Sequence, residues 1–75
     1  MKLKHIGSNV TEVTNDKATV LFSYSTPVAA CMNDGSGFIR TSTRYSQTTS
    51  KHINQWLDGT RAREVPQAEL EALVS

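Results

Sequence analysis

Apolar and polar residues alternate along the first third of the chain, which is the pattern of half-buried strands. Residues 10–14 and 18–24 are rich in β-branched and aromatic side chains, and a polar turn signal at residues 15–17 separates them. Tyr24 falls on the apolar face of the second segment, so we expect it in the core. The pattern predicts a β-hairpin.

A second hairpin is predicted further along the chain. Residues 28–32 and 38–43 flank a loop at residues 33–37, which contains two glycines able to adopt positive φ. Pro27 has no backbone N–H for a ladder, so it predicts a strand break or an edge before the apolar run resumes. A further short strand is expected at residues 3–6.

The pattern changes to a helical one after Ser46. Ile53, Trp56 and Leu57 follow the i, i+3, i+4 spacing of a buried stripe, which predicts a helix over residues 50–58 that packs on the sheet. Hydroxyl side chains precede it as candidate N-caps, and Gly59 suits the position after its end. We expect Trp56 in the core.

A second amphipathic segment begins at Pro66. It places Leu70, Leu73 and Val74 on one face, which could pack on the same sheet or on another subunit. The predicted class is therefore α+β: a small antiparallel sheet of three to five strands with one or two short C-terminal helices packed on it. Residues 1–75 form a single domain, since 75 residues leave no room for a second.

Composition narrows the classes of protein. No apolar run approaches the roughly 20 residues that a membrane span requires, and no signal peptide is recognisable, so we expect a cytoplasmic protein without a membrane partner. The single cysteine, Cys31, excludes an intramolecular disulfide, and we expect it to be a buried thiol. We predict no metal site, because one thiol and the two histidines have no recognised ligand spacing.

Charge is distributed unevenly along the chain. The net charge is +1, but residues 40–63 carry five basic side chains against the single acidic Asp58. A helix start rich in hydroxyl groups lies within this segment, and a helix N-terminus attracts anions. The basic side chains, with Tyr45 as a stacking platform for one base, predict a phosphate-binding surface. Its candidate binding residues are Arg40, Arg44, Tyr45, Thr48, Thr49, Lys51, Arg61 and Arg63.

Two segments of this chain are familiar. Residues 22–30 (FSYSTPVAA) and 45–57 (YSQTTSKHINQWL), with Arg40-Thr41 between them, resemble a family of short bacteriophage and prophage proteins without an established activity. The resemblance covers about half of the chain and leaves out residues 1–17 and 60–75. It implies a viral origin, a compact domain in the cytoplasm of a bacterial host, and no catalytic residues.

Signatures of an enzyme are weak. Only His5 and His52 could act as histidine bases for Cys31 or a serine, and nothing in the sequence places them together. We expect His52, one turn before Trp56, to pack on that indole ring. We therefore predict no catalytic residues and no cofactor.

Two functions remain open, and we favour the first because it requires no feature that this sequence lacks. The first is a non-enzymatic protein that binds and modulates, or inhibits, a host or phage protein, with the acidic amphipathic end from Pro66 to Val74 as a candidate contact. The alternative is a nucleic-acid-binding accessory protein that contacts phosphates through residues 40–63, although its pI of about 7.9 is below that of strongly basic binders. We also predict a homodimer, because small cores are often supplemented by a second subunit.

Overall fold

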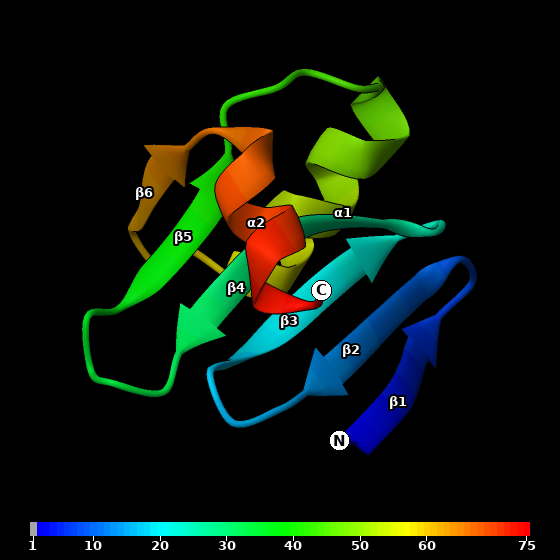
Figure 1. Cartoon of the computed structure of the whole chain (residues 1–75). Helices are drawn as coiled ribbons and strands as arrows, with labels where there is room; N and C mark the ends of the chain where they lie inside the picture. The colour runs from blue at the N-terminus through cyan, green and yellow to red at the C-terminus, as the bar shows by residue number, and fades with distance from the viewer. Residues whose placement is uncertain (1) are drawn as a thin grey trace.

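The computed structural model describes residues 2–75, which form a six-stranded sheet with one helix on each face (Figure 1). The strands lie in chain order across the sheet, and every neighbouring pair is antiparallel except β5 and β6, which are parallel. The elements are β1 (Lys2–Gly7), β2 (Val10–Thr14), β3 (Ala18–Ser23), β4 (Thr26–Met32), β5 (Phe38–Thr41), α1 (Gln47–Leu57), β6 (Ala62–Val65) and α2 (Gln67–Leu73).

Both predicted hairpins are confirmed, as β2–β3 and β4–β5, and the short N-terminal strand is confirmed as β1. The first turn is stabilised by Asn15, whose side-chain oxygen accepts hydrogen bonds from the backbone N–H groups of Lys17 and Ala18 at 2.8 and 3.0 Å. An asparagine that satisfies the backbone two and three residues ahead of it is the turn chemistry that the polar residues 15–17 predicted.

The predicted class α+β is confirmed, but the sheet of three to five antiparallel strands was too small. The sixth strand, β6, pairs in parallel with β5, and α1 is the crossover that joins them. Two of the four residues of β6, Arg63 and Glu64, are charged and exposed. An edge strand of this kind has little of the β-branched pattern by which strands are recognised in a sequence.

The prediction that Pro27 breaks a strand or marks an edge was wrong. Pro27 is the second residue of β4, an interior strand between β3 and β5. The register of β3 against β4 shifts next to it, between Leu21 and Phe22, and a bulge is a place where a sheet tolerates proline. The carbonyl of Pro27 accepts a hydrogen bond of 2.8 Å from Nε2 of Gln67 at the start of α2.

Helix α1 covers one face of the sheet. Ile53 and Leu57 are buried there against Leu21, Val28 and Ala29. The helix begins at Gln47, three residues before its predicted start, because Ser46 serves as the N-cap. It ends where Asp58, at φ 48°, and Gly59, at φ 81°, take left-handed conformations, as the position of the glycine predicted.

Trp56 is half-buried on the α1 face rather than enclosed in the core as predicted. Its ring packs edge-on against Phe38, with centroids 5.8 Å apart, and its Nε1–H donates a 2.6 Å hydrogen bond to a carboxylate oxygen of Glu12 on β2. A buried or half-buried indole usually satisfies its N–H in this way.

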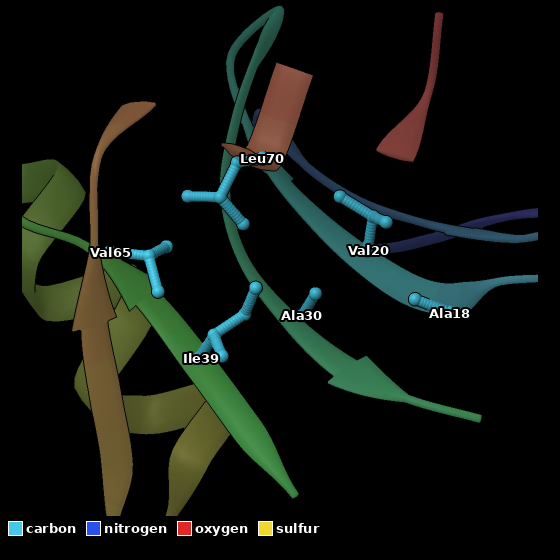
Figure 2. Close-up of a cluster of buried hydrophobic side chains, with 6 residues drawn as sticks. All are labelled: Ala18, Val20, Ala30, Ile39, Val65 and Leu70. Carbon is cyan, nitrogen blue, oxygen red and sulfur yellow. The ribbon is translucent and has the colours of Figure 1, made fainter. Parts of the chain in front are cut away.

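Helix α2 covers the opposite face, where it completes a separate apolar cluster (Figure 2). Leu70 is fully buried, and Leu73 and Val74 pack against the same cluster. This outcome decides between the two alternatives for the C-terminal segment, since its apolar stripe is buried against the sheet of its own chain. The six buried members of the cluster are Ala18, Val20, Ala30, Ile39, Val65 and Leu70.

Two further expectations about burial were wrong. Tyr24 is 54% exposed, because it follows the end of β3 in a turn at φ 59° and does not continue the alternation of the strand. Cys31, expected as a buried thiol, is half-buried near the end of β4.

Candidate functional site

The first turn of α1 lies next to the end of β5, and its backbone N–H groups carry a partial positive charge that no acidic side chain of this turn neutralises. The hydroxyl of Ser46 accepts the N–H of Thr49 at 3.1 Å, and the Ser46 carbonyl accepts the N–H of Ser50 at 3.0 Å. No acidic residue lies in the first turn. The partial positive charge of the helix N-terminus is therefore not neutralised within the helix.

A broad, open hollow of about 790 Å³ surrounds this helix start. Arg44 and Lys51 are the only charged side chains that line it among residues 2–75, and Tyr45, 46% exposed, forms part of its wall. The combination of two cations, an exposed aromatic ring and several hydroxyl and amide groups suits an extended, polar, anionic ligand. The lining residues are Arg44, Tyr45, Ser46, Gln47, Thr48, Ser50, Lys51 and Asn54.

A smaller and more enclosed cavity of about 120 Å³ adjoins this hollow, and Arg44, Tyr45 and Ser50 line both. Arg40 of β5 and Glu64 of β6 lie on its sheet side. Arg40 and Glu64 are opposite each other in the β5–β6 register, so both point to the face that α1 covers.

The structure brings together six of the eight residues predicted for the binding surface, around these two adjoining hollows. Thr49 belongs to the six but is buried and hydrogen-bonded within the protein. Arg61 and Arg63 line neither hollow. Arg61 lies just before β6, near the beginning of β5, whereas both hollows lie near the opposite end of β5. Arg63 is opposite Ile39 in the register and therefore lies on the α2 face.

A hydrogen-bonded network that the sequence did not reveal joins β3 to α1. The Ser23 hydroxyl lies 2.8 Å from Nδ1 of His52 and 3.1 Å from the hydroxyl of Thr49. Ser46 extends the network, because its hydroxyl contacts that of Thr49 at 3.2 Å. The segments 22–30 and 45–57 therefore meet in space, although no spacing rule relates a strand residue to a distant helix residue.

The pairing of a serine with a histidine has the composition of a nucleophile and its base, but its burial makes it structural. Ser23 is 2% exposed, so its hydroxyl is closed off from a substrate. His52 also lies beside the exposed ring of Tyr24, with ring centroids 6.1 Å apart, while its expected packing on Trp56 stays a prediction. The network holds the first half of α1 against β3 and so sets the position of the hollow.

Two general findings concern the part of the chain that the structure describes. No group of three or more His, Cys, Asp or Glu side chains within residues 2–75 is placed to hold a metal ion. Neither helix in this part is long and apolar enough to cross a membrane.

Comparison with known proteins places the chain in a family and gives no activity. No curated protein and no solved structure matches it. The match to the model of a family of unknown function, DUF8033, extends over residues 1–72 and so includes the N-terminal end and most of the C-terminal end that the resemblance of segments 22–30 and 45–57 left out. The chain therefore belongs to the family of unknown function DUF8033.

Proposed function

We propose that this protein is a non-enzymatic nucleic-acid-binding protein that holds the backbone of a single strand in the hollow at the start of α1. The observation that carries the proposal is the lining of this hollow, to which the described residues contribute the cations Arg44 and Lys51 and no acidic side chain. Phosphate groups bind to basic side chains and to helix N-termini, and Tyr45 offers a ring on which one base stacks.

Burial of the C-terminal segment favours this choice over protein binding. The acidic amphipathic end was the candidate contact for a protein partner, but Leu70 is fully buried and Leu73 and Val74 are partly buried against the sheet. Their apolar surface already stabilises the fold. The basic surface is available by contrast, since Arg44, Tyr45 and Lys51 are all exposed.

Binding to a host or phage protein remains a second candidate because of the free edge at β1. All six residues of β1 are exposed, and Leu3 is 63% exposed. A partner strand can pair with such an edge through its main chain. The same edge is available to a second copy, so the homodimer stays a prediction, and light scattering at micromolar concentration that gives the mass of one 8.3 kDa chain would contradict it.

The proposal is tested by fluorescence anisotropy with a labelled single-stranded oligothymidylate. Two phosphate contacts, from Arg44 and Lys51, predict that log K falls with log salt with a slope of about −1.4. Arg44→Gln and Lys51→Gln should each weaken binding and reduce the slope by about 0.7. Tyr45→Leu should weaken binding at every salt concentration while it leaves the slope unchanged, because stacking releases no counterions.

Arg63→Gln is the matched control. It removes the same charge from an exposed position on the other face of the sheet and should change neither the affinity nor the slope. Equal weakening by Arg63→Gln and Arg44→Gln would show that only net charge matters and would contradict a located site. Absence of binding to single- and double-stranded DNA and RNA at 50 mM salt would exclude nucleic acid and favour a protein partner.

A further inference from the structure

The cavity of about 120 Å³ is a site in its own right and differs from the open hollow that it adjoins. It lies between the ends of β5 and β6 and the inner side of α1, whereas the hollow lies around the outside of the helix start. One wall is formed by three hydroxyl-bearing residues, Thr41 at the end of β5 and Ser42 and Thr43 in the loop that leads to α1. Hydroxyl groups and the two guanidinium groups of Arg40 and Arg44 make up most of its polar lining.

Arg40 supplies the observation that points to a ligand. Its Nε atom is buried and has no hydrogen-bond partner in the protein, while Nη1 of the same guanidinium donates a 3.3 Å hydrogen bond to Oδ1 of Asn54. A buried N–H without an acceptor is costly, so an acceptor from outside the protein is expected next to it. The planar fork of a guanidinium matches the paired oxygens of a carboxylate or a phosphate, and the phosphate fits the nucleic-acid ligand proposed above.

The size of the cavity selects the kind of phosphate. Its volume equals that of about four water molecules at roughly 30 Å³ each, which accommodates one phosphate group. A phosphate in the interior of a strand carries a sugar on both sides. A terminal phosphate carries one, and the adjoining hollow, with Tyr45 in its wall, is the place for the attached nucleoside.

We propose that the Arg40 cavity recognises the terminal phosphate of a nucleic-acid strand, so that the protein binds strand ends in preference to strand interiors. The inference rests on the proposed function and adds the ligand's end group to it. A terminal phosphate carries a charge of about −1.5 to −2 at neutral pH, against −1 for an internal phosphate, and so interacts more strongly with Arg40 and Arg44.

Glu64 is the one acidic side chain that lines the cavity among the described residues. Its carboxylate opposes a bound phosphate and limits the affinity for one. Glu64→Gln should therefore strengthen the binding of a phosphorylated end, and this direction is opposite to the loss expected from the arginine variants.

The experiment compares three oligothymidylates of equal length that carry a 5′-phosphate, a 3′-phosphate or no terminal phosphate. Anisotropy should show that one phosphorylated form binds about ten-fold more tightly than the unphosphorylated form, and the 5′ and 3′ arms identify which end the cavity accepts. Arg40→Gln should bring this ratio to about one, Arg40→Lys should leave it intermediate, and Glu64→Gln should raise it. Arg63→Gln, matched in charge to Arg40→Gln, should leave the ratio unchanged.

The outcomes separate this inference from the function on which it rests. Equal binding of the three oligonucleotides would overturn terminal recognition, would mean that water satisfies Arg40, and would leave the strand-binding function standing. Failure of all three to bind would overturn both. A ratio that survives Arg40→Gln would place the phosphate elsewhere and overturn the assignment to this cavity. Circular dichroism melts of each variant confirm that it is folded, and Arg40→Lys tests the site should Arg40→Gln fail to fold.

Discussion

The two faces of the sheet are built from different kinds of contact. The α2 face is closed mainly by apolar side chains, with Leu70 fully buried at its centre, while the side-chain amides of Gln67 and Asn15 donate hydrogen bonds to the carbonyls of Pro27 and Leu73. The α1 face also has a buried apolar cluster, but polar contacts surround it: Ser23 with His52, and Trp56 with Glu12. The α2 face is therefore held mainly by apolar burial, whereas the α1 face also uses paired polar side chains that hold the start of α1 in a defined place.

Leu70→Ala on the α2 face is expected to cause the largest loss in the free energy of unfolding. Removal of a fully buried leucine leaves a cavity and should cost about 3 to 5 kcal/mol, comparable with the whole stability of a domain this small. Urea denaturation followed by circular dichroism should show a largely unfolded variant, whereas the exposed neighbour Glu69→Ala should change the free energy of unfolding by less than about 0.5 kcal/mol. A midpoint near that of the parent for Leu70→Ala would contradict the packing of α2.

Trp56→Ala tests the α1 face and should cost less, about 2 to 3 kcal/mol, because the ring is only half-buried. Trp56→Phe keeps most of the packing on Phe38 and removes the hydrogen bond to Glu12, which should cost about 1 to 2 kcal/mol. Both values come from the same denaturation experiment. A larger loss for Trp56→Ala than for Leu70→Ala would reverse the assignment of stability to the α2 face.

Ser23→Ala tests whether polar pairing positions α1. The variant leaves the buried Thr49 and the half-buried His52 with fewer partners and should lower the free energy of unfolding by about 1 to 2 kcal/mol. The side-chain NMR signals of His52 should shift, and oligonucleotide affinity should fall if the network sets the hollow. Ser25→Ala, exposed in the adjacent turn, is the control and should change neither.

Ser46→Ala removes the N-cap of α1 and should cost about 1 kcal/mol. The start of the helix should fray, so affinity for an oligonucleotide should fall together with stability. Amide hydrogen exchange at Thr49, whose N–H the cap accepts, measures the fraying directly. Protection unchanged from the parent would show that the Ser46 hydroxyl is dispensable for the helix start.

The smallest effect on stability is expected from a change at Asp34, which lies in the β4–β5 turn and belongs to neither face. Hydrogen bonds from the side chain and then the backbone of Ser36 hold the pKa of this carboxyl below its ordinary value of 3.8. A depressed pKa in the folded state means stability that is present above pH 3.8 and is lost as the pH falls through the folded value. NMR titration should find the lowered pKa, and Asp34→Asn should remove this small acid dependence, while an unshifted pKa would contradict the contact with Ser36.

The local elements of this protein were predictable from its sequence because they depend on neighbours in the chain. Alternation specified the strands of both hairpins, and the spacing of Ile53 and Leu57 specified the buried side of α1. The charge of residues 40–63 located the candidate surface, since a helix start next to a basic strand end is a local juxtaposition. These predictions failed at Tyr24, where a turn interrupts the alternation, and at Pro27, where a bulge lets the strand continue through a proline.

The parallel strand and the polar network were decided by tertiary structure alone. β6 becomes a strand because α1 returns the chain beside β5, and its own sequence, with exposed Arg63 and Glu64, has no strong preference for the sheet. The contact of Ser23 with His52 likewise depends on α1 crossing β3. The same crossover aims Arg40 into a cavity and leaves Arg61 outside it. A sequence reports which side chains are available, whereas only the packing of distant segments determines which of them share a site.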